Sequence, residues 1–124
     1  MLKLLEGFPD DVIAVTARGR VTGADYDKVM IPAVERALRG HDKVRCYYEL
    51  GREFEAFDLK SAWKDFVIGV EHLPRWERMA VVTDVEWIRH AMRAFGFVMP
   101  GELRVFATGQ ASEARDWIAE TAAA

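Results

Sequence analysis

The sequence predicts an α/β fold: a five-stranded, mixed and mainly parallel sheet with four helices, in the order β-β-α-β-α-β-α-β-α. Short apolar runs typical of strands are separated by longer segments with the 3.6-residue period of amphipathic helices. The first two runs follow each other directly, whereas each later run is preceded by a helix, so the later strands are expected to pair in parallel. A chain of 124 residues fits one domain spanning 1–124.

The first two strands are expected at residues 2–7 (LKLLEG) and 11–20 (DVIAVTARGR). Both are rich in Leu, Ile and Val, which favour a half-buried extended chain. The sequence Gly-Phe-Pro-Asp at 7–10 between them is typical of a turn. Because so short a connection leaves no room for a crossover, we expect these two strands to pair antiparallel.

The first helix is predicted from 24 to 39, where apolar residues recur on one face and Gly40 supplies the stop. Thr22 and Asp25 have the spacing of a capping box, with Asp in place of the usual Glu or Gln. Pro32 lies inside this segment and is expected to bend the helix, because proline removes a backbone hydrogen bond.

The remaining elements alternate regularly between strand and helix. They are expected as a strand at 43–50, a helix from 58 to about 72, a strand at 78–84, a helix at 84–95, a strand at 102–108 and a helix at 112–120. The charged and aromatic residues 51–58 are expected to form a loop. Asp58 is a suitable N-cap for the helix that follows, since its carboxylate can accept bonds from free amides of the first turn.

Composition limits the partners and the compartment. The net charge of -3 is small, which gives no reason to expect nucleic acid as a partner. Cys46 lies in an alternating apolar run, and one cysteine cannot form an internal disulfide. The N-terminal residues are too weakly charged and too short for a signal peptide, and no apolar run reaches the length of a membrane span. We therefore expect a cytoplasmic protein.

The sequence offers no residue set typical of catalysis or cofactor binding. His41, His72 and His90 are scattered, and none is spaced to share one side of an element with a second metal ligand. No GxSxG segment is present, and Cys46 lies in mid-strand. A phosphate-binding loop at 51–58 is disfavoured, because it has one glycine and three acidic residues. We expect neither an enzyme, a metal site nor a cofactor.

The order of the elements, together with several loose apolar and aromatic motifs, resembles a known family. The motifs are VTGADYDKVMIPAVERAL, SAWKDF, ERMAVVTDVEWI, PGELRVF and EARDWI. From Met1 to about Ala119 the chain is similar to the SpoIIAA-like STAS proteins, in the branch often labelled STAS/CRAL-TRIO-like. The resemblance implies the STAS fold. It also raises the prospect of apolar ligands or membranes, because the fold is shared with lipid-carrying CRAL-TRIO domains.

One departure from the wider family bears on regulation. In the anti-sigma-factor antagonists, an Asp-Ser pair at the start of the second helix carries the phosphorylated serine. Here Asp58 is followed by Leu59, and Ser61 lies within the first predicted turn. A phosphate on Ser61 would gain from the helix N-terminus but face Asp58 and Asp65. Ser61 is therefore interpreted as an ordinary exposed first-turn residue.

Strongly amphipathic faces on the second and third helices make them the predicted working surface. Ordinary core packing against the sheet is one reading of these faces. The other is an apolar groove between the two helices, opened by the flexible segment FGFVMPG at 95–101. The residues expected to bind an apolar ligand or membrane are Trp63, Phe66, Val67, Val70, Trp87, Ile88, Met92, Phe95, Phe97 and Met99. Those expected to meet anionic head groups are Arg89, His90 and Arg93.

From the sequence we expect a non-enzymatic binding module for a lipid-like or other apolar ligand, able to associate peripherally with membranes. The alternative is a protein-interaction or regulatory module of the anti-sigma-antagonist type that lacks the usual phosphoserine. A homodimer is also expected, because Ile68 lies on the polar side of the second predicted helix and adds to the apolar surface. Neither hypothesis identifies the ligand.

Overall fold

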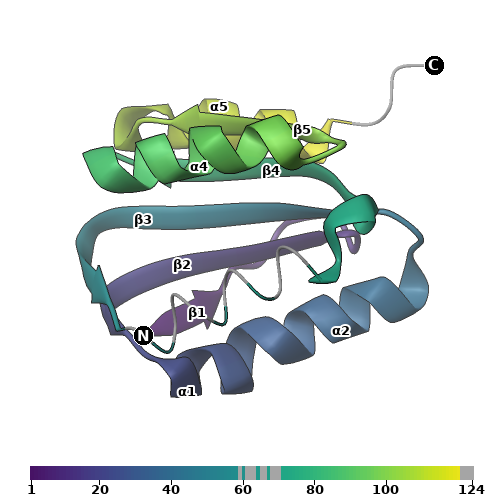
Figure 1. Cartoon of the computed structure of the whole chain (residues 1–124), viewed down its shortest axis with the longest axis horizontal. Coiled ribbons are helices and arrows are strands. Elements are labelled where there is room, and N and C mark those ends of the chain that lie inside the picture. Colours follow the sequence, from purple (N-terminus) through teal and green to yellow (C-terminus); the bar gives the residue numbers. More distant parts are fainter. Residues whose placement is uncertain (59, 61–63, 65–66, 68–70, 121–124) are drawn as a thin grey trace.

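The computed structural model describes residues 1–58, 60, 64, 67 and 71–120. A five-stranded sheet forms its centre, with the strands in the order β1-β2-β3-β4-β5 (Figure 1). The strands are β1 (Leu2–Leu4), β2 (Val12–Val21), β3 (Val44–Phe57), β4 (Trp76–Thr83) and β5 (Glu102–Phe106). β1 pairs antiparallel with β2, and the other pairs are parallel. The predicted α/β class with a mixed, mainly parallel sheet is confirmed.

The helices cover both faces of the sheet. They are α1 (Gly23–Asp25), a π-helical turn at Tyr26–Met30, α2 (Ile31–Gly40), α4 (Glu86–Val98) and α5 (Ala111–Ala119), with short 3-10 turns at Leu73–Arg75 and Thr108–Gln110. Lys60, Lys64, Val67 and Glu71 are also helical. The rest of the predicted second helix, including Ser61 and Ile68, lies outside the described residues.

Two apolar clusters, one on each face, hold the layers together. On one face, Tyr26, Met30 and Val34 of the first helical region and Ile88 of α4 pack on the inward residues of the strands. On the other face, Ala114, Trp117 and Ile118 of α5 pack on Tyr47, Ala80 and Val82. The first helical region and α4 therefore share one face, and α5 covers the other.

The first helical region begins as predicted but is not a regular helix. The backbone N–H of Asp25 donates to Thr22 Oγ1 (3.3 Å) and that of Thr22 donates to Asp25 Oδ2 (2.8 Å), which confirms the capping box. A π-helical turn at Tyr26–Met30 then precedes α2. Pro32 follows this turn, inside a run of helical residues from Gly23 to Gly40. Its predicted position within the first helical segment is confirmed, although the segment is not one regular helix.

The prediction of a loop at 51–58 is wrong for residues 51–57, because β3 continues to Phe57. Its added residues pair with the end of β2, with Phe54 opposite Gly19 and Phe57 opposite Val21. The register between the strands shifts around Gly19, whose φ of +57° glycine adopts without strain. Glu53 and Glu55 therefore lie on a strand.

The third crossover helix, α4, is longer than predicted. It runs to Val98 and not to Phe95, so Gly96, Phe97 and Val98 are helical and do not form a flexible loop. The backbone N–H of Met99 still donates to the Phe95 carbonyl oxygen (3.2 Å). A β-carbon at Gly96 would lie in ordinary contact with Leu103, at 3.5 Å, so this part of α4 lies next to β5. Pro100, which follows, ends the helix because it offers no N–H.

Candidate functional site

The start of α4 is fixed to the carboxyl end of the parallel strands. Arg89 donates from Nη1 to the Thr83 carbonyl oxygen (2.8 Å), and the N–H of Val85 donates to Thr83 Oγ1 (3.1 Å). Asp84 accepts hydrogen bonds from the Thr108 hydroxyl and backbone N–H, and these bonds hold the pKa of the Asp84 carboxyl below its usual value. This network links the end of β4 to the segment after β5, so α4 is rigidly placed.

One face of α4 belongs to the core. Ile88 and Met99 are 4% and 6% exposed, and Met92 and Phe95 are half-buried against the same cluster. These four positions recur at helical spacing and face the sheet. Of the residues predicted to bind an apolar ligand, Ile88 and Met99 are thus placed in the core.

The face of α4 next to this one leaves apolar side chains in solvent. Trp87, Phe97 and Val98 are 60%, 91% and 64% exposed. Ala91 and Ala94 lie between them and are exposed too. Trp87, Ala91, Ala94 and Val98, here called the α4 stripe, fall within an arc of about 60° at 3.6 residues per turn. Phe97 borders the stripe.

Trp87 is anchored although its surface is largely exposed. Its ring meets the ring of Phe57, at the end of β3, edge to face with centroids 6.4 Å apart. Phe57 in turn contacts Phe54 and Tyr48, at centroid distances of 4.9 and 6.3 Å. The hydroxyl of Tyr48 is 2.9 Å from that of Tyr26. The aromatic cluster therefore orients Trp87 without burying it.

The basic residues predicted to meet head groups differ in their freedom. His90 and Arg93 are exposed beside the α4 stripe. Arg89 is half-buried and one of its guanidinium nitrogens already binds the Thr83 carbonyl oxygen. Arg93 and His90 are thus the two side chains available to an anion, whereas Arg89 mainly fixes the helix.

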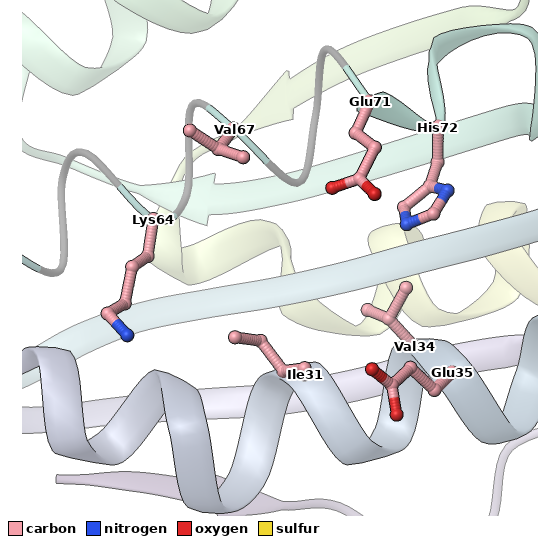
Figure 2. Close-up of a pocket in the computed structure, with 7 residues that line it drawn as sticks. All are labelled: Ile31, Val34, Glu35, Lys64, Val67, Glu71 and His72. Carbon is pink, nitrogen blue, oxygen red and sulfur yellow. The ribbon is translucent and has the colours of Figure 1, made fainter.

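A second candidate is a groove of about 460 Å³ between α2 and the helical residues at 64, 67 and 71. One wall carries Ile31, Val34 and Glu35 of α2, and Figure 2 shows the other wall, made of Lys64, Val67, Glu71 and His72. Lys64 also forms an ion pair with Asp27. Three apolar and four polar residues therefore line the groove, which lies between α2 and the helical residues that follow β3.

This position differs from the groove expected between the second and third helices. Val67, which is 37% exposed, is the predicted site residue that lines it. Trp63, Phe66 and Val70 lie outside the described residues. Trp87 and Phe97 both lie on α4, the third predicted helix, near its two ends. The predicted site residues do not include Ala91, Ala94 and Val98, although their spacing from Trp87 identifies them once the helix extends to Val98.

The buried thiol of Cys46 and the buried hydroxyl of Tyr47 have surroundings typical of structural residues. Cys46 is buried within the core, as its alternating run predicts. Burial, reinforced by a hydrogen bond to Glu49 (2.8 Å), raises the pKa of the Tyr47 hydroxyl to about 12. Across the described part of the chain, no cluster of three or more His, Cys, Asp or Glu is arranged to hold a metal ion. Nor does any described helix have the length and apolar character needed to cross a membrane.

Comparison with known proteins agrees with this architecture. An uncharacterized protein with a SpoIIAA-like fold from Shewanella loihica PV-4 superposes with a TM-score of 0.75 at 28% sequence identity, and the match covers 94% of this chain and 93% of that one. Comparison with curated proteins gives no match. The family model described as SpoIIAA-like matches residues 12–119, which is most of the sequence. The chain therefore belongs to the SpoIIAA-like family.

Proposed function

We propose that this protein is a non-catalytic binding module that docks on anionic membrane surfaces through the exposed side of α4. The observation that carries the proposal is the exposure of Trp87, Phe97 and Val98 on one rigidly placed helix. Exposed apolar side chains are common when scattered, but a contiguous group marks an interaction site. Trp and Phe beside basic residues are typical of helices that lie in a membrane interface.

Charge supports a membrane as the partner. Arg93 and His90 are exposed on the same helix as Phe97, so an anionic head group can meet Arg93 while the ring of Phe97 enters the acyl boundary. The groove beside α2 is less suited to an enclosed lipid tail, because Glu35, Lys64, Glu71 and His72 line it. Surface docking therefore fits the described residues better than lipid carriage in a cavity.

A protein-interaction or regulatory module is the second candidate. The SpoIIAA-like fold fits such a role. Ala91 and Ala94, in the middle of the α4 stripe, would let the backbone of a partner helix approach closely. In this case the same apolar surface would bind another protein and not lipid.

Flotation with phosphatidylcholine vesicles, with and without phosphatidylserine, tests the membrane proposal. We expect binding that requires phosphatidylserine, weakens in high salt, and is strongly reduced by Phe97→Ser and by Arg93→Glu. Leu4→Ser is the matched control, because Leu4 is 44% exposed but lies on β1. A parent protein that stays with neither vesicle at low salt would overturn the membrane role and favour the protein-interaction module.

A further inference from the structure

The groove between α2 and the helical residues that follow β3 has two unlike ends. Figure 2 shows Lys64 at one end and Glu71 and His72 at the other, with Ile31 and Val67 between them. Glu35 lies on the α2 wall, one turn beyond Ile31 on the same face of the helix. The volume of about 460 Å³ is in the range of small-molecule sites, so the groove has room for a small organic ligand.

The two ends also differ in whether their charges are paired. Lys64 forms an ion pair with Asp27, so its charge is compensated within the protein. Glu35 and Glu71 form no hydrogen bond or ion pair with any of the residues that the structure describes. They approach the groove from facing walls, and the end that they share carries uncompensated negative charge. A cationic group of a ligand is therefore favoured at this end.

We propose that the groove binds a small organic cation, with an ammonium group at Glu35 and Glu71 and a hydrocarbon body over Ile31 and Val67. An ammonium group has three N–H donors, so it can bind both carboxylates through charge-assisted hydrogen bonds. This site is separate from the proposed membrane-binding surface, because none of the described residues that line the groove belongs to α4.

The apolar part of the lining selects an organic cation over a bare metal ion. Metal ions gain from oxygen, nitrogen or sulfur ligands, and Ile31, Val34 and Val67 offer none of these in their side chains. Among the described residues, no three His, Cys, Asp or Glu side chains are arranged around a common metal position. A hydrocarbon chain laid on the three apolar side chains leaves water, which favours binding.

Lys64 restricts the ligand to a single cationic end. A diamine long enough to span the groove would bring its second ammonium group against the Lys64 charge. Asp27 offers that group little attraction, because it is already paired with Lys64. The groove should therefore bind a monoamine more tightly than a diamine of the same length.

A titration followed by methyl NMR tests the proposal with four probes that share an eight-carbon chain. These are n-octylammonium, n-octanol, n-octanoate and 1,8-diaminooctane. We expect n-octylammonium to bind most tightly and to shift the methyl signals of Ile31, Val34 and Val67 in a saturable manner. Its affinity should fall in high salt. The methyl signals of Ile118, buried under α5 on the other face of the sheet, should not move.

Charge-neutral variants test the two carboxylates. Glu35→Gln and Glu71→Gln should each weaken n-octylammonium binding about threefold, as expected for an ion pair in contact with solvent, and leave n-octanol binding unchanged. Glu113→Gln is the matched control, because Glu113 is exposed on α5. Both groove variants remove exposed carboxylates that bind no described residue, so they should fold as the parent does.

Three outcomes would contradict the proposal. Equal affinity for n-octanol and n-octylammonium would show that the carboxylates do not select the ligand. Preference for n-octanoate would assign the groove to a fatty acid held by Lys64. Absence of any saturable shift at Ile31, Val34 and Val67 would mean that the groove is not a binding site. None of these results bears on vesicle binding through α4, so the two proposals fail separately.

Discussion

At the scale of single residues, Gly101 lies where the backbone of β4 leaves no room for a β-carbon. A β-carbon there would lie 2.2 Å from the carbonyl oxygen of Glu77 and 2.5 Å from that of Trp76. Both contacts are with backbone, which cannot swing aside. We expect Gly101→Ala to lower the free energy of unfolding by about 2 kcal/mol or more, in the range of overpacked sites.

Chemical denaturation measures this effect, with Gly109→Ala as the control. No atom lies within 4 Å of a β-carbon placed at Gly109. Equal stability of the two variants would mean that Gly101 does not lie as close to the backbone of Trp76 and Glu77 as the structure shows.

Asp84 is expected to make the free energy of unfolding decrease as the pH falls into the acid range. The hydrogen bonds from Thr108 favour the carboxylate, so the pKa of Asp84 is lower in the folded state than its ordinary value of 3.8. Its contribution is therefore complete above that ordinary value and is lost as the pH falls through the lowered one. We expect the stability difference between the parent and Asp84→Asn to be constant near neutral pH and to shrink in acid.

Denaturation curves from neutral to acidic pH check this expectation. Asp116→Asn, at an exposed site on α5, is the control. A difference that grows in acid would show that the Asp84 carboxylate is not stabilised by folding.

At the scale of elements, the end of β3 matters most for the candidate site. Phe57 holds Trp87, Phe54 and Tyr48 together, so this extension of β3 positions the aromatic end of the α4 stripe. We expect Phe57→Ala to cost about 2 kcal/mol, less than for a fully buried ring because Phe57 is half-buried. Trp87 fluorescence should shift as its contact is lost.

Phe97→Ala is the matched control, because the same side chain is removed from a site that is 91% exposed. It should leave the free energy of unfolding nearly unchanged. Equal losses from both variants would contradict the central place of Phe57 in the cluster.

The elements show what local sequence patterns can predict. The capping box at Thr22 and Asp25 was predicted correctly because its two partners are three residues apart. The length of β3 was not, because Phe54 and Phe57 become strand residues only by pairing with β2, more than thirty residues away. The end of α4 was missed for a similar reason: Gly96 weakens a helix in isolation but fits against Leu103.

At the scale of the whole molecule, Arg45 ties α5 to the sheet. Arg45 is 6% exposed, and its guanidinium donates to Glu77 at 2.6 Å and to the carbonyl oxygens of Ile118 (2.9 Å) and Glu120. We expect Arg45→Leu to cost about 3 kcal/mol, because it leaves the Glu77 carboxylate and the last carbonyls of α5 without these donors. Amide hydrogen exchange should rise first in α5.

Arg36→Leu is the control, since Arg36 is exposed on α2. Uniform exchange changes along the chain in Arg45→Leu would mean that the arginine acts on global stability and not on the docking of α5.

The fold as a whole was predictable, whereas the geometry of the candidate site was predictable only in part. Order and spacing of the elements indicated the class and the family, and both are confirmed. The amphipathic pattern of the third helix predicted a working surface, which stays a prediction; Trp87 and Phe97 are exposed on α4. It could not tell which apolar face meets the sheet, because Ile88 and Trp87 are adjacent and similarly apolar. That choice depends on the placement of α4 over β4 and β5.

The strand order has a consequence for synthesis on the ribosome. Because every strand pairs with its neighbours in the chain, the sheet can grow in the order in which the residues emerge. The face occupied by α5 then stays bare until Trp117 and Ile118 have left the exit tunnel. Nascent chains that already carry β5 but not α5 expose Tyr47, Ala80 and Val82, and they are the forms for which chaperones should compete.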